Sequence, residues 1–130
     1  MVRGRSFDQN DVEAHFAAEF TFETDCWDMH EAMTTGADFV LFDVRSPTMF
    51  DKGHIPGAIN LPHGKMIASK LAAWPEDTLF VTYCAGPHCN GAARGALRLA
   101  RLGGPVKIMA GDVTGWIDEG FALATGSVAS

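Results

Sequence analysis

The sequence predicts an α/β fold in which helices cover both faces of a parallel β-sheet, giving three layers. Segments with strand character alternate with segments of helical periodicity along most of the chain, which is typical of βαβ units. Residues 39–44 and 78–83 are continuous runs rich in β-branched and aromatic residues, as in parallel strands buried on both faces. With 130 residues, of which 47% are hydrophobic and 20% charged, the chain suits one packed domain.

The chain is predicted to open with a helix and a short strand. Residues 8–19 begin near Asp8 or Asn10, either of which can cap a helix. Apolar side chains recur there at the spacing of an amphipathic helix: Val12, Phe16, Ala17 and Phe20. Residues 20–24 then alternate between apolar and polar, as a short strand would.

The remaining elements follow the same alternation. Asp25 and Ser46 stand at positions where they can cap helices, and Pro47 suits the first helical position after Ser46. The predicted helices are, in order, residues 27–34, 47–50, 66–74, 91–102 and 113–119. The predicted strands are residues 39–44, 58–61, 78–83 and 106–109, and most of the junctions contain Gly or Pro.

Charge and apolar run length exclude several classes of protein. Ten Lys and Arg against sixteen Asp and Glu give a net charge of −6, which repels nucleic acid and anionic lipid. The longest apolar runs reach a handful of residues, whereas a membrane span needs about 20. Three cysteines are too few for a disulfide framework, and the first residues do not have the pattern of a secretory signal. We therefore expect a cytoplasmic protein that binds neither nucleic acid nor membrane.

Cys84 is the candidate reactive residue. It follows the strand at residues 78–83 directly and precedes a tight loop that leads into a helix rich in small residues. Ligands of parallel sheets gather at the carboxyl ends of strands, where loop amides and helix amino termini converge. Such amides and the helix dipole favour a thiolate over a thiol, and the thiolate is the nucleophile. We therefore expect an activated Cys84.

The chain resembles the single-domain rhodaneses, a family of sulfurtransferases. The matching residues lie between positions 39 and 121: residues 42–45 with Phe50, residues 53–60, Tyr83 and Cys84, the helix at residues 93–97, and Gly111 with Trp116. The resemblance implies a five-stranded parallel sheet flanked by helices over residues 21–125. Residues 1–20 would then be an added helical extension packed on the domain, and residues 126–130 a flexible tail.

The resemblance also implies a mechanism. Cys84 would take the outer sulfur of a donor such as thiosulfate, hold it as a persulfide, and pass it to cyanide or a thiol acceptor. The loop after Cys84 would bind the substrate through Ala85, Gly86, Pro87, His88, Cys89 and Asn90. No cofactor, metal or general base is expected, and an acceptor protein is a possible partner of a monomer or weak dimer.

Four positions depart from the family pattern. The family has a basic residue where Cys89 stands and Ser or Thr where Asn90 stands. Pro87 removes one loop amide, and Asp112 replaces a second glycine before the last helix. An anionic donor would then depend on loop amides, His88 and Arg94, so thiosulfate activity is expected to be weak.

Several residues have two interpretations. Cys89 either resolves or accepts the Cys84 persulfide, or it fills the space of the missing basic side chain. His88 beside two cysteines suggests zinc, although Cys-x3-His-Cys is not a common zinc spacing. Asp43 and Arg45 either orient the loop or form structural hydrogen bonds. The helical stripe of Arg94, Arg98 and Arg101 is either an ordinary solvated face or a surface that steers an anionic donor or docks an acidic partner.

Two other functions compete with sulfur transfer. A phosphatase or arsenate reductase on this sheet would need a Cys-x5-Arg loop, but the residue six positions after Cys84 is Asn90. A noncatalytic or redox-sensing module would use Cys84 and Cys89 as a thiol pair. Cys26 is expected to be a bystander at the start of a helix.

Overall fold

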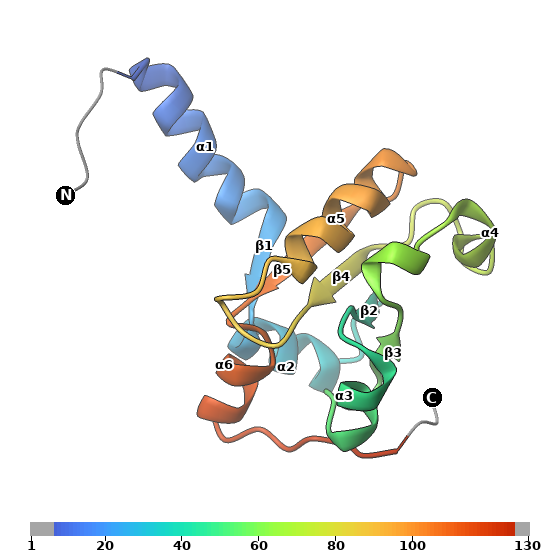
Figure 1. Cartoon of the computed structure of the whole chain (residues 1–130). Coiled ribbons are helices and arrows are strands. Elements are labelled where there is room, and N and C mark those ends of the chain that lie inside the picture. The colour runs from blue at the N-terminus through green and yellow to red at the C-terminus, as the bar shows by residue number, and fades with distance from the viewer. Residues whose placement is uncertain (1–6, 127–130) are drawn as a thin grey trace.

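The computed structural model describes residues 7–126 and contains a five-stranded parallel sheet (Figure 1). The strand order is β1-β5-β4-β2-β3, and every neighbouring pair is parallel. The strands are β1 (Glu23–Asp25), β2 (Val40–Asp43), β3 (Ile59–Asn60), β4 (Phe80–Tyr83) and β5 (Val106–Ala110). The predicted fold class and the implied number of strands are confirmed, and β4, which precedes Cys84, is the central strand.

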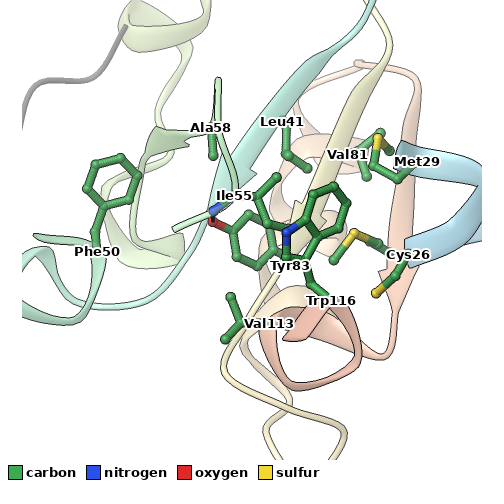
Figure 2. Packing of buried hydrophobic residues seen from close by; sticks show 11 residues of the cluster. Cys26, Met29, Leu41, Phe50, Ile55, Ala58, Val81, Tyr83, Val113 and Trp116 are labelled. Atoms are coloured by element: carbon green, nitrogen blue, oxygen red, sulfur yellow. Dashed lines mark hydrogen bonds between the residues drawn. The ribbon is translucent and has the colours of Figure 1, made fainter. Parts of the chain in front are cut away.

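Helices cover both faces of the sheet, so the domain has three layers. The helices are α1 (Gln9–Phe22), α2 (Cys26–Thr34), α3 (Pro47–Lys52), the 3-10 turn η1 (His63–Lys65), α4 (Ala68–Leu71), α5 (Gly91–Arg101) and α6 (Asp112–Asp118). On one face, α2 and α6 pack on the sheet through Met29 and Trp116, with Tyr83 beside them (Figure 2). On the other face, α5 packs through Ala92 and Leu99. Cys84 belongs to this second cluster, which places its sulfur on the α5 side.

The predicted helix caps are present. Asp8 is the N-cap of α1 and accepts a hydrogen bond from the Asn10 N–H. The Asp25 carboxylate accepts from the Asp28 N–H at 2.8 Å, and the Ser46 hydroxyl accepts from the Met49 N–H at 3.4 Å. These side chains satisfy amides that the first turn of a helix leaves without partners.

Two predicted elements have different lengths in the structure. The strand predicted at residues 20–24 begins only at Glu23, because α1 continues through Phe22. The helix predicted over residues 66–74 is reduced to the single turn α4. Met66 is extended and only 1% exposed, so its burial against the α5 face holds the chain out of a helix there.

Helix α1 does not pack as its apolar spacing predicts. None of its residues is buried, and Phe16, Phe20 and Phe22 are all exposed. The helix contacts β1 and β5 and extends away from the sheet (Figure 1). Residues 1–6 of the predicted extension and residues 127–130 of the predicted flexible tail lie outside the described residues.

Candidate functional site

The end of the central strand positions Cys84. Its side chain is 5% exposed, and its sulfur lies against Gly91, the first residue of α5. A side-chain carbon placed on Gly91 would be 2.8 Å from the Cys84 Sγ and 3.3 Å from a methyl group of Val44. The absence of a side chain at Gly91 is therefore what allows α5 to begin directly beside this sulfur.

Cys84 lines an open hollow of about 510 Å³. The other lining residues come from the segment after β2, from α3 and η1, from the loop after β4 and from the start of α5: Val44, Arg45, Met49, His63, Ala85, Cys89, Asn90, Gly91 and Arg94. The Arg94 guanidinium donates to the Asn90 side-chain oxygen at 3.1 Å, which holds one cation at the rim. Arg98 and Arg101 line a separate hollow, so of the arginine stripe only Arg94 borders the Cys84 hollow.

The loop after Cys84 divides the predicted binding residues into two groups. Ala85, Cys89 and Asn90 line the hollow. Gly86 begins the outer turn, which the Cys89 N–H closes by donating to the Gly86 carbonyl at 2.9 Å. Pro87 and His88 are exposed in that turn, and the His88 ring lies against Gly86, as does the Thr114 hydroxyl.

Asp112 forms a hydrogen bond with the backbone amide of Cys84 itself. Its buried carboxylate accepts a hydrogen bond from the Cys84 N–H at 2.8 Å. Burial raises the pKa of Asp112, while the Cys84 amide and the His88 charge act in the opposite direction. Asp112 also has a φ of 57°, a left-handed conformation that suits Gly best and that Asp and Asn tolerate. The sequence marks Asp112 as a departure from glycine without giving the direction of its side chain, and in the structure the carboxylate points toward Cys84.

The two loop cysteines have opposite pKa shifts. Burial, and after it the hydrogen bond with Cys89, raise the pKa of Cys84 to about 11. The same hydrogen bond, together with the Gly91 N–H, lowers the pKa of Cys89. Cys89 is therefore the thiol of the pair that loses its proton more readily, and Cys84 is the one that keeps it. Burial thus opposes the Cys84 thiolate that the sequence predicts, and the amide of Cys84 is already bonded to Asp112.

Helix α6 fixes the loop from behind. The Val113 N–H donates to the Cys84 carbonyl at 3.1 Å, and the Thr114 N–H donates to the Ala85 carbonyl at 3.2 Å. The Thr114 hydroxyl donates to the same Ala85 carbonyl at 2.8 Å. The two amides belong to the first turn of α6, where an N–H has no partner within the helix. Together with the Thr114 hydroxyl they set the direction of the chain after Cys84.

Asp43 and Arg45 form structural hydrogen bonds, one of the two interpretations of these residues. The buried Arg45 guanidinium donates to both carboxylate oxygens of Asp43 and to the Gly53 carbonyl, at 2.6 to 3.1 Å. The Tyr83 hydroxyl donates to the Asp43 carboxylate at 2.7 Å and accepts from the Ile55 N–H at 3.1 Å. This network joins β2 to β4. The charge of Arg45 is paired with Asp43, even though Arg45 also borders the hollow.

Cys26 lies on the other side of Asp112 from Cys84. Its thiol donates to the Asp112 carbonyl at 3.4 Å, and its sulfur lies near the positions where Gly111 and Gly115 would carry a side chain. Burial raises the pKa of Cys26 to about 11, and the Asp112 charge contributes. Cys26 is thus a packing residue that supports the turn into α6.

No group of three or more His, Cys, Asp or Glu side chains among residues 7–126 could hold a metal ion. Within the same residues, no helix is both long and apolar enough to cross a membrane.

Comparisons with known proteins identify the family. The model of the rhodanese-like domain matches residues 27–119. The chain is 36% identical over 96 residues to the HTH-type transcriptional regulator Rv0324 of Mycobacterium tuberculosis. The match covers 68% of this chain and 42% of that regulator, so this chain spans less than half the length of the relative.

Solved structures agree with the fold. The BH2092 protein of Bacillus halodurans has a TM-score of 0.83 and 30% identity, over 92% of this chain and 88% of that one. A rhodanese-related protein of Thermoplasma volcanium has a TM-score of 0.66 and 25% identity, over 79% and 97% of the two chains. A thiosulfate sulfurtransferase of Pseudomonas aeruginosa shares the fold at 21% identity, with a TM-score of 0.70 over 84% of this chain and 21% of that one. The extent of the family match, together with the central-strand cysteine, shows that this chain belongs to the family of rhodanese-like domains.

Proposed function

We propose that the protein is a sulfurtransferase that carries sulfane sulfur as a persulfide on Cys84. The observation that supports this most directly is the place of Cys84: in a rhodanese-like domain it ends the central strand and lines an open hollow. The hollow offers space for a donor and for the added sulfur atom. The glycine at the start of α5 keeps that space next to the sulfur.

The first half-reaction begins with proton transfer within the cysteine pair. The Cys84 thiol gives its proton to the Cys89 sulfur, with which it shares a hydrogen bond. The Cys84 thiolate then attacks the outer sulfur of thiosulfate, the sulfur–sulfur bond breaks, and sulfite leaves. In the second half-reaction, cyanide or a thiol attacks the outer sulfur of the persulfide and the Cys84 thiolate leaves.

The charges around the site favour donors less anionic than thiosulfate. Asp112 places a carboxylate beneath Cys84 and uses its amide, and Pro87 has no amide to donate. Arg94 supplies a cation at the rim, which supports a role in steering a donor. We therefore propose thiosulfate as a weak donor and low-charge persulfides of small thiols as better ones.

The test is sulfur loading measured by mass. The full chain is incubated with thiosulfate or with the persulfide of a small thiol, and intact mass is recorded beside Cys84→Ala and Cys26→Ser variants. A sulfane adduct adds about 32 Da. We expect the adduct on wild type and Cys26→Ser and none on Cys84→Ala. An adduct on Cys84→Ala that equals that of wild type would refute Cys84 as the carrier.

A redox-sensing module is the second candidate, because the sulfurs of Cys84 and Cys89 both lie near Gly91 and both residues line the same hollow. Mild peroxide separates the candidates. A sensor forms a reversible Cys84–Cys89 disulfide readily and resists sulfur loading, whereas a sulfurtransferase loads sulfur from the donors above.

The proposal also covers the compartment, the oligomeric state and the acceptors of the protein. We propose a cytoplasmic protein that acts as a monomer or weak dimer and passes sulfur to a small acceptor or to an acceptor protein. It needs no cofactor, because the persulfide is formed on the chain itself.

A further inference from the structure

The two loop sulfurs meet at one point of the site. A side-chain carbon on Gly91 would lie 2.8 Å from the Cys84 Sγ and 3.4 Å from the Cys89 Sγ, so both sulfurs face the same residue. Both cysteines also line the same hollow. Cys26 packs in the core on the opposite face of the sheet. The chain thus brings together one specific pair of its three thiols.

The Cys89 sulfur is held toward Cys84 by its own loop. The Gly91 N–H donates to it at 3.4 Å, and the Cys89 N–H closes the turn onto Gly86. Cys89 is also only partly buried, so it reaches solvent as well as its partner. A nucleophile placed in this way needs no large loop movement to approach Cys84.

We propose that Cys89 resolves the Cys84 persulfide by forming a disulfide with Cys84, so that the site releases the donor sulfur as sulfide. This inference rests on the proposed function, because it needs sulfur on Cys84. Cys89 passes the proton it took from Cys84 to the outer sulfur, and the Cys89 sulfur attacks the Cys84 Sγ. A Cys84–Cys89 disulfide bond forms, and the bond to the outer sulfur breaks. The outer sulfur leaves as hydrosulfide with its electron pair.

The electrons balance within the chain. The two cysteines are oxidised to a disulfide by two electrons, and the sulfane sulfur is reduced to sulfide by the same two. The disulfide returns to the dithiol by exchange with two equivalents of a small-molecule thiol, which end as their own disulfide. The donor sulfur therefore leaves as sulfide even when no cyanide is present.

The inner sulfur is the target because of where the two sulfurs of a persulfide lie. The inner sulfur is the Cys84 Sγ, whose place beside Cys89 is set by β4 and Gly91. The outer sulfur has the open hollow as its space. Attack on the inner sulfur therefore uses the contact that already exists.

The experiment follows the mass of the loaded protein with time in the absence of reductant. Wild type, Cys89→Ser and Cys26→Ser are loaded with the persulfide of a small thiol, freed of the donor, and sampled for intact mass and released sulfide. In wild type and Cys26→Ser we expect the adduct of about 32 Da to give way to a species about 2 Da lighter than the dithiol, with one sulfide released. In Cys89→Ser the adduct should persist about tenfold longer. Peptide mapping of wild type should locate the disulfide at Cys84 and Cys89.

The outcomes separate the two proposals. If wild type keeps its adduct as long as Cys89→Ser, the resolving role is refuted and the persulfide carrier stands. If neither protein accepts sulfur, the proposed function fails and the resolving role fails with it. A disulfide that maps to Cys26, or that links two chains, also overturns the role of Cys89.

Discussion

Gly91→Ala tests the packing of the candidate site. The new methyl carbon would stand 2.8 Å from the Cys84 Sγ and 3.3 Å from Val44, and both residues are buried at the ends of strands. Overpacking of a core costs about 1–3 kcal/mol. Alanine gains at most about 1 kcal/mol of helix propensity over glycine, and less at the first position of a helix. We therefore expect the free energy of unfolding to fall by about 1–2 kcal/mol.

Gly95→Ala is the matched control, because Gly95 lies one turn further along α5 and is also buried. Its added methyl would be 3.1 Å from Val44 and 3.2 Å from the terminal carbon of Met66, a flexible group. We expect its stability within about 1 kcal/mol of wild type, since the gain in propensity offsets the crowding.

Urea denaturation measures both stabilities, and labelling with a small alkylating reagent measures the access to Cys84. Gly91→Ala should react about tenfold more slowly at Cys84, because the methyl group displaces the sulfur from its place in the hollow. Gly95→Ala should react as wild type does. If Gly91→Ala were as stable as Gly95→Ala and its Cys84 equally reactive, the sulfur would not lie against Gly91 and the reasoning would be refuted.

Three further results are expected. Tyr83→Phe leaves the buried Ile55 N–H without its acceptor and removes a donor to a carboxylate, so chemical denaturation should show a loss of about 2–4 kcal/mol; a loss below 0.5 kcal/mol would contradict the network. In wild type, alkylation near pH 7 should modify Cys89 before Cys84, and the rate of Cys84 alkylation should rise about tenfold per pH unit toward its pKa of about 11. Equal alkylation rates of the two cysteines near pH 7 would contradict the opposite pKa shifts of Cys84 and Cys89. Asp112→Asn keeps an acceptor for the Cys84 amide but removes the charge, so the pH profile of Cys84 alkylation should move to lower pH at nearly unchanged stability; an unmoved profile would show that the charge does not reach the sulfur.

The strands and the position of Cys84 at the end of one of them could be predicted because their signals are local. The run of β-formers before Cys84 marks a buried strand by composition alone, and its place next to a glycine-led helix follows from chain order. The N-caps at Asp25 and Ser46 were equally local, since a cap bonds to an amide within three residues.

The charge state of the site could not be predicted, because it depends on contacts between distant segments. Asp112 reaches the Cys84 amide across 28 positions of the chain, and the sequence does not show whether its carboxylate points toward that amide or away. The balance between burial and hydrogen bonding that makes Cys89 more acidic than Cys84 is also set by tertiary packing. In the same way, the burial of Met66 shortened a helix that its sequence favours.

Because hydrogen bonds join α6 to the loop after Cys84, the two segments must open together. Cys84 and Ala85 exchange four hydrogen bonds with residues 112–114, so the loop cannot swing out while the first turn of α6 stays closed. The amides of Val113 and Thr114 therefore exchange with solvent deuterium only when the loop opens. A compound that binds in the hollow and holds the loop closed must slow the exchange of these two amides, although neither Val113 nor Thr114 lines the hollow.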